Sequence, residues 1–465
     1  MNHLVLSSFE RLLFSFTAWF TAPSADTFLM VAAGWILCLG RHTMTGLLRT
    51  LSPRGRKSHD AYHYFFRKAA WEVGFLFQDL FYRIVDRFIP EPQTILLAGD
   101  DTLEKHTGLK IHGAGIFRDT VRSTRKFTAY AWGLNWAVLA VILPLPFLKD
   151  HYIALPILAR LCPKKRKPKT PKSHNRRKKR SKRSIRRRSR RPAQKATTVQ
   201  TMLEMLREVV QWLPHRQFRF LGDGAYAPLA GQLPQNVEMI SRIRRDAALY
   251  KLPPKRRRKG QRGRPRQKGE RLPSPEATAR APRTTWERTR LTLYGEHVDM
   301  ELHSYVCLWW EVAKSKPIRV VCVRDPEGKR ETEFFFSTNT QLTGKQIAEG
   351  ASHRWPIEVA FREAKQDFGM GDSQARTKKA VERITPFCLW LLSLVKFWYL
   401  TEGHRVVARN TPQYEWYCHK STISFSDVLA ALRRATWKER ISAMSGLKTD
   451  VRKMLQALVN VASGA

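Results

Sequence analysis

The order of apolar patterns along the chain predicts a mixed α/β fold with helical regions at both ends. Residues 1–90 keep apolar side chains at three- and four-residue spacing, which is the period of an α-helix. From Gln93 onward, short apolar runs typical of strands alternate with one helical segment, Thr198–Trp212. Helical spacing returns after Gly344. Strands that alternate with helices in this way indicate a layered α/β domain.

The first 90 residues contain helical runs at 28–39, 65–77 and 81–88, joined by the basic connector Leu51–Ser58. Helices with basic loops could bind DNA ends, but a plain helical bundle would have the same pattern. Both interpretations stay open for this region.

The strands of the next segment, residues 91–238, are predicted from four apolar runs at 95–98, 125–132, 136–143 and 218–221. Residues 127–147 carry no charge and are long enough to span a bilayer. However, Asn135 and two prolines interrupt this stretch. We therefore expect two core strands separated by a turn or bulge at Gly133-Leu134-Asn135, and no membrane span.

Residues 239–340 are predicted to form a basic linker and a β-rich insertion, because runs at 290–294, 305–312, 319–323 and 333–336 have strand character. A turn at Asp325-Pro326-Glu327-Gly328 separates the last two runs. Residues 341–400 then return to helices, and residues 401–465 form a C-terminal helical region.

Charge points to a polyanionic partner, since the 465 residues carry a net charge of +44. Two tracts, Lys164–Lys195 and Lys251–Arg271, together hold 30 Lys or Arg and one Glu, so the rest of the chain still carries +15. The first tract predicts a disordered basic arm at 163–196. The second contains Gly263-Arg264-Pro265-Arg266, which is either a minor-groove arm or a solvated linker.

The cysteines are scattered along the chain without the close pairs of a zinc site. We expect reduced, buried thiols and a cytoplasmic, DNA-associated protein.

Acidic residues recur at two strand ends and on one later helix. The runs Ile95-Leu96-Leu97-Ala98 and Phe218-Arg219-Phe220-Leu221 are each followed by Gly-Asp, at Asp100 and Asp223. Only one of Asp100 and Asp101 can face a site within a strand, because side chains alternate. We choose Asp100, which matches Asp223 in position, and keep Asp101 as the alternative.

On the later helix, Arg354, Glu358 and Lys365 are spaced by four and seven residues and share one face within about 40°. Each acid alone is more often a cap, turn or surface residue. Together, two strand-end aspartates and one helical glutamate between cations predict a phosphodiester-cleaving site with two Mg²⁺ ions, for which Mn²⁺ is a possible substitute.

These residues resemble the DDE insertion-sequence transposases, in the branch with the signature Tyr-x2-Arg-x3-Glu-x6-Lys. Arg354, Glu358 and Lys365 match that spacing, whereas Ala351 stands at the tyrosine position. The similarity includes Asp100-Asp101-Thr102 and Asp223-Gly224-Ala225-Tyr226 and covers roughly Gln93–Trp398. In that family the tyrosine and arginine help to hold DNA near the cut, so Ala351 removes one expected phosphate contact.

The resemblance implies an RNase H-like catalytic domain with a β-rich insertion in the 134 residues between Asp223 and Glu358. Asp100, Asp223 and Glu358 would be the catalytic metal ligands, and Arg354, Lys365 and Arg362 would bind DNA phosphates. The implied activity is cut-and-paste transposition of double-stranded DNA at terminal inverted repeats, by a homodimer on paired ends. A hairpin intermediate would need an aromatic platform for a flipped base, and the insertion offers candidates at Trp286, Trp309 and Trp310.

Three other functions stay open at this point. The chain could be a DNA- or RNA-binding protein on an inactive RNase H-like scaffold, or a nuclease without strand transfer. A membrane-surface protein would be a third possibility, based on residues 127–147 and the basic arm.

Overall fold

The computed structural model describes residues 4–51, 57–124, 126–163, 198–254, 266–410 and 423–443, with a few more residues up to 459. Among these residues the helices are α1 (Ser7–Phe14), α2 (Ala22–Leu37), α3 (Met44–Arg49), α4 (His59–Arg67), α5 (Val73–Phe88), α6 (Thr198–Trp212), α7 (Pro275–Arg280), α8 (Trp310–Ala313), α9 (Gly344–Ser352), α10 (Pro356–Gln366), α11 (Lys378–Trp398), α12 (His404–Asn410) and α13 (Phe425–Ser442). The strands are β1 (Ile95–Lys105), β2 (Gly115–Arg118), β3 (Tyr130–Pro144), β4 (Tyr152–Leu161), β5 (Phe218–Gly222), β6 (Val237–Arg242), β7 (Leu249–Tyr250), β8 (Arg271–Leu272), β9 (Glu287–Leu293), β10 (Glu296–Leu308), β11 (Pro317–Arg324) and β12 (Glu333–Ser337).

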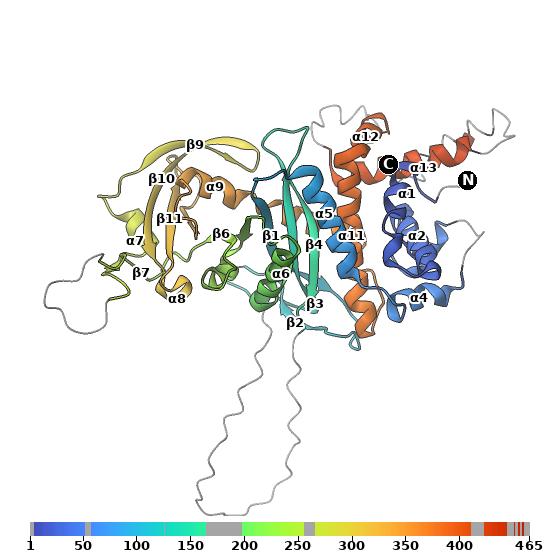
Figure 1. The fold of residues 1–465 in the computed structure, drawn as a ribbon, viewed down its shortest axis with the longest axis horizontal. Helices are drawn as coiled ribbons and strands as arrows, with labels where there is room; N and C mark the ends of the chain where they lie inside the picture. The colour runs from blue at the N-terminus through green and yellow to red at the C-terminus, as the bar shows by residue number, and fades with distance from the viewer. Residues whose placement is uncertain are drawn as a thin grey trace, which may run out of the picture.

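The part of the sheet built from β1, β3, β4, β5 and β6 has the strand order β4-β3-β1-β5-β6. Strands β4, β3 and β1 pair antiparallel, whereas β1, β5 and β6 pair parallel. Helix α11 packs against β4, and α6 packs against β3 (Figure 1). Helix α10 also packs against β4. This mixed sheet with helical regions at both ends of the chain confirms the predicted α/β, RNase H-like fold.

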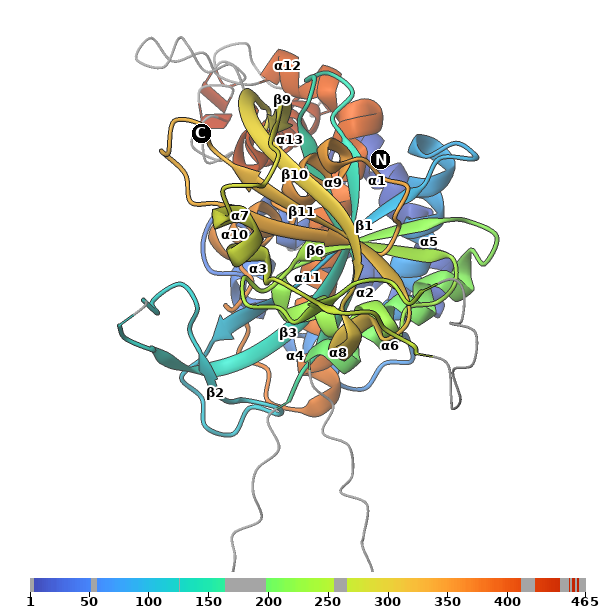
Figure 2. The same cartoon turned by 90° about the vertical axis from the view of Figure 1, so that its left-hand side faces the viewer.

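The insertion continues the same sheet. Strand β12 pairs with β6 antiparallel, β11 follows β12, and β10 follows β11, so one sheet of twelve strands runs through both parts of the described chain. Figure 2 views the molecule from the insertion end, where β9, β10 and β11 lie in front of the catalytic strands.

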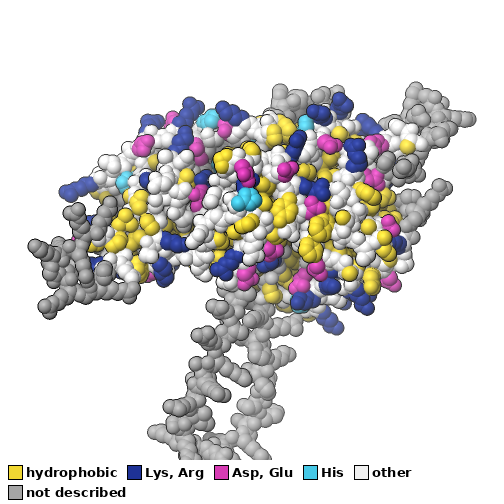
Figure 3. Space-filling view, in the orientation of Figure 1, with side chains coloured by type: hydrophobic (Ala, Val, Ile, Leu, Met, Phe, Trp, Pro, Cys, Tyr) yellow, Lys and Arg dark blue, Asp and Glu magenta, His cyan; other side chains and the backbone are white. Residues whose placement is uncertain are grey.

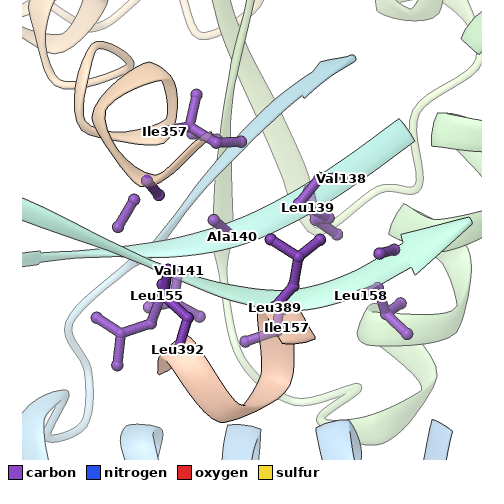
Figure 4. Packing of buried hydrophobic residues seen from close by; sticks show 14 of the residues in the cluster. Val138, Leu139, Ala140, Val141, Leu155, Ile157, Leu158, Ile357, Leu389 and Leu392 are labelled. Atoms are coloured by element: carbon purple, nitrogen blue, oxygen red, sulfur yellow. The ribbon is translucent and has the colours of Figure 1, made fainter. Parts of the chain in front are cut away.

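The core lies where β3 and β4 meet α11. Both strands are buried over most of their length, as expected for near-continuous apolar runs covered on two faces. Leu389 and Leu392 of α11 lie beside Val141, Leu155 and Ile157 of the two strands (Figure 4). The cysteines within the described ranges are buried free thiols, as predicted, and Cys418 lies outside those ranges.

One continuous helical stretch, residues 378–410, is long and apolar enough to cross a membrane by length and composition. However, 94% of its most apolar window is buried inside the protein. It is the central core helix of the fold.

The prediction of two strands within residues 125–143 is wrong, because β3 runs unbroken from Tyr130 to Pro144. Gly133 lies opposite the backbone of β1, and a Cβ atom there would meet the Glu104 carbonyl oxygen at 2.1 Å. The glycine therefore allows two strands to approach closely and does not mark a turn. The predicted arm at 163–196 and most of the second basic tract lie outside the described residues.

Arginines of the later helices hold the N-terminal helices in place. Arg433 of α13 donates to the carbonyl oxygens of Ile36 and Cys38 at the end of α2, at 2.6 and 2.7 Å. Arg383 of α11 donates to the carbonyl oxygens of Phe66, within α4, and of Trp71, which follows α4. Buried carbonyl groups that lose their donors cost free energy, so these contacts fix the helical region against α11.

We expect Arg383→Met to lower the free energy of unfolding by about 3 kcal/mol. Removing the buried guanidinium leaves the carbonyl oxygens that accept its hydrogen bonds without a donor. Denaturant titration would measure this change. Lys379→Met, at an exposed position on the same helix, is the matched control and should change stability little. Equal stability of the two variants would contradict the anchoring role of Arg383.

Candidate active site

Asp100 and Asp223 lie at the same level on neighbouring parallel strands. Gly99 of β1 is paired with Gly222 of β5. Asp100 and Asp223 each follow one of these paired glycines directly. Adjacent strands are about 4.8 Å apart, which brings the two backbones close together. Asp223 follows the end of β5, as predicted, but β1 continues to Lys105, so the expectation that Asp100 ends its strand is wrong.

The repeated Gly-Asp pattern has a packing cause. A Cβ atom at Gly99 would meet the Phe220 ring at 2.4 Å, and one at Gly222 would meet the same ring at 2.9 Å. Both glycines thus leave room for an aromatic side chain beneath the two aspartates.

Glu358 faces Asp100 across one guanidinium group. Helix α10 begins at Pro356, so Arg354 lies in the turn before the helix and not on it, which corrects the predicted helical position. Its Nη1 donates to Asp100 Oδ2 at 2.6 Å and its Nη2 donates to Glu358 Oε1 at 2.5 Å. Arg354 and Glu358, four residues apart, still lie on the same side because Trp355 between them has helical backbone angles. Two candidate catalytic carboxylates therefore converge on the same cation.

Asp223 completes the group through electrostatics. Its negative charge raises the pKa of Arg354 and the pKa of Asp101, so it lies close to both. Burial raises the pKa of Asp100 to about 6, and the neighbouring Arg354 opposes that rise. Asp101 interacts with Asp223, and it accepts from Asn135 Nδ2 at 3.2 Å and from the Tyr226 hydroxyl at 3.4 Å. The geometry toward Glu358 thus favours Asp100 over Asp101.

Lys365 reaches the same face of β1. Its Nζ donates to Thr102 Oγ1 at 2.7 Å, two residues beyond Asp100. Desolvation of the ammonium group lowers the pKa of Lys365. Arg362, the third predicted phosphate ligand, is exposed, and Glu358 pairs with Arg354 instead.

Sequence analysis missed Glu104, a buried carboxylate on this face of β1. It accepts from Trp136 Nε1 at 2.6 Å and from Thr385 Oγ1 at 2.9 Å, and His106 Nε2 lies 2.8 Å from its other oxygen. The two-residue alternation from Asp100 through Thr102 could have placed it on this face. Its full set of partners indicates that it holds β1 against β3 and α11.

The donor chemistry of the site suits a divalent cation, because carboxylate oxygens are the preferred ligands of hard ions. Among the described residues, no three His, Cys, Asp or Glu side chains are grouped closely enough to hold a metal as they stand. Arg354 already bridges Asp100 and Glu358. A metal ion would therefore compete with this guanidinium for Asp100 and Glu358, because Arg354 occupies one oxygen of each carboxylate.

The three tryptophans considered as base platforms differ in environment. Trp309 is buried, Trp286 lies under the Arg324 guanidinium at 4.0 Å, and Trp310 lies 5.6 Å from Lys268 Nζ. Two other aromatic residues, Tyr294 and Trp355, line a small cavity together with Arg354, and their ring centroids are 6.1 Å apart.

Basic side chains are spread over the visible face of the molecule, with acidic residues between them (Figure 3). The positive charge of the described chain is thus not confined to one patch.

Comparison with known families gives a match to the DDE superfamily endonucleases over residues 16–297. The matched range covers more than half of the chain and includes Asp100 and Asp223, and it ends before Glu358. No curated protein matches the chain.

Proposed function

Because the chain belongs to the DDE superfamily of endonucleases, we propose that it is a transposase that cleaves the ends of an insertion sequence and joins the freed 3′-hydroxyls to target DNA. One observation carries the proposal: Asp100 and Glu358, which are 258 residues apart in the chain, meet on the Arg354 guanidinium beside Asp223. A purely structural ion pair would not need acids from β1, β5 and α10 at the same place.

Members of this superfamily use divalent metal ions, and we propose Mg²⁺, with Mn²⁺ as a substitute, held by Asp100, Asp223 and Glu358. Such ions activate the attacking oxygen and stabilise the leaving one. The chain supplies the carboxylates and a set of cations for the substrate. Arg354 and Lys365 neutralise phosphates next to the cleaved bond, and Arg362 extends this contact along α10.

The partner is double-stranded DNA, and pairing of two element ends calls for a homodimer. Incubation of the full chain with a duplex carrying the flanking inverted repeats and Mg²⁺ would test this function. We expect excision with joined products. Cleavage without joining would support the nuclease alternative, and duplex binding without metal-dependent cleavage would support an inactive DNA-binding protein.

Lys365 gives the proposed reaction a distinct pH dependence. Since desolvation lowers its pKa, the ammonium loses its proton, and with it the phosphate contact, at lower pH than an ordinary lysine. We expect the cleavage rate of the parent protein to decline at a lower pH than the loss of a proton from an ordinary lysine would give. Lys365→Arg keeps its positive charge, so its cleavage rate should stay high to a higher pH. Lys365→Met should cleave about 10- to 100-fold more slowly at pH 8.

The measurement is a series of cleavage rates between about pH 7 and 10. An alkaline limb that is the same in the parent and in Lys365→Arg would contradict this assignment.

A further inference from the structure

The turn between β9 and β10 carries a tyrosine where local chemistry favours asparagine. Leu293 pairs with Glu296, so Tyr294 and Gly295 form a two-residue hairpin loop. Both have positive φ, at 56° and 87°. Such loops strongly prefer Asn-Gly, because a bulky side chain is strained in the left-handed region.

The strained tyrosine is exposed to solvent. Its side chain is 56% exposed, and its ring contacts Trp355, which is 48% exposed, edge-on. Burial of the ring therefore does not explain why the chain keeps a tyrosine here. Strain of this kind is found where function requires a particular side chain.

The hairpin is held firmly over α9 and the turn that carries Arg354. The Thr292 amide donates to Glu349 Oε1 of α9 at 2.9 Å. Gly295 lies against His151, where a Cβ atom would come within 2.7 Å of the imidazole. The loop is thus fixed on both sides of Tyr294.

Tyr294 lines a small cavity together with Arg242, Ala351, Arg354 and Gly222, the residue before Asp223. Arg242 pairs with Glu333, and Arg354 pairs with Asp100 and Glu358. A phenol and two guanidinium groups are all hydrogen-bond donors, and they suit an anionic oxygen. The donors that a phosphate oxygen needs therefore lie directly beside the candidate catalytic acids, and a phosphate would compete with Glu333, Asp100 and Glu358 for the two guanidinium groups.

We propose that Tyr294 binds substrate by donating its hydroxyl hydrogen to a backbone phosphate adjacent to the cleaved bond, together with Arg354 and Arg242. This inference rests on the proposed function and adds a ligand group from the insertion. Ala351, which stands where the signature has tyrosine, lines the same cavity. The phenol that α9 lacks is thus supplied by the β9–β10 hairpin.

Two substitutions of Tyr294 separate binding from folding. Tyr294→Phe removes only the hydroxyl and should lower kcat/KM for cleavage about 10- to 100-fold, as expected for a lost hydrogen bond to a charged group. Tyr294→Asn should lose cleavage at least as much, yet raise the melting temperature by about 2 °C, because asparagine relieves the strained turn. If Tyr294 only stabilised the fold, Tyr294→Asn would lower the melting temperature.

Lys314→Gly is the matched control, because Lys314 has the same φ of 56° at a turn after α8. It should gain stability without losing cleavage. If Tyr294→Phe cleaves as fast as the parent, or if Tyr294→Asn melts at a lower temperature, the inference is overturned.

The phosphate itself can be located with methylphosphonate linkages placed one at a time beside the cleaved bond. At one position the neutral linkage should slow the parent about 10-fold or more and have little further effect on Tyr294→Phe. If the loss caused by the neutral linkage and the loss caused by Tyr294→Phe multiply at every position, the proposed contact between Tyr294 and a phosphate is contradicted. A parent that cleaves no repeat-bearing DNA would instead refute the proposed function.

Discussion

Glu358→Gln is expected to reduce metal-dependent cleavage about a thousandfold or more, because a neutral amide cannot replace a carboxylate ligand that stabilises charge in the transition state. The fold should survive, since Glu358 is only half-buried at the start of α10 and the Arg354 bond to Asp100 remains. Cleavage of repeat-bearing duplex in Mg²⁺ measures the loss, and duplex binding in EDTA checks that the protein is intact.

Glu382→Gln is a suitable control for this experiment. Glu382 lies on α11, is 41% exposed in its side chain and makes one long contact to His112 at 3.9 Å. It should cleave like the parent. Residual nicking by Glu358→Gln at the parent rate would remove Glu358 from the set of proposed ligands.

Arg354→Met should have opposite effects on metal binding and on cleavage. Without the guanidinium, Asp100 and Glu358 lose their shared cation, and a divalent ion no longer competes with it for the two carboxylates. We therefore expect Mn²⁺ to bind about tenfold more tightly or better, and cleavage to fall about 100-fold because a phosphate contact is lost. Titration with Mn²⁺, followed by electron paramagnetic resonance, would measure the affinity.

The same variant should also change the pH dependence of metal binding. Burial raises the pKa of Asp100 to about 6 while Arg354 holds it down, so removing Arg354 raises it further. Only the ionised carboxylate binds metal, and acid should therefore release Mn²⁺ below about pH 6 in the parent and at higher pH in Arg354→Met. Arg354→Lys, which keeps the charge, should stay close to the parent. Weaker Mn²⁺ binding by Arg354→Met at pH 8 would contradict the bridging role of the arginine.

The α/β fold was predictable because its strongest signals are local. The helical spacing of residues 1–90 and the apolar run before Asp223 each arise from burial of one face of an element. Gly133 misled the prediction because a glycine in a turn and a glycine under a neighbouring carbonyl look alike in sequence. Only the paired strand distinguishes them.

The candidate site was predictable to a similar extent. The spacing of Glu358 and Lys365 placed them on one side of α10, with Arg354 in the turn just before it, and the Gly-Asp repeat located the two aspartates. The bridging by Arg354 depends on a contact across 254 residues, which no local pattern records. Tyr294 was missed for the same reason, because its relation to Arg354 exists only once β9 and β10 dock on α9.

The continuity of the sheet limits how this enzyme could be shortened. Residues Ile240, Ser241 and Arg242 of β6 pair with β12 on one edge, so excising the insertion would leave that edge of β6 open. Open edges recruit strands from other molecules. A trimmed version that joins β6 directly to α9 should therefore precipitate, and a compact form of this protein would need a substitute strand at that border.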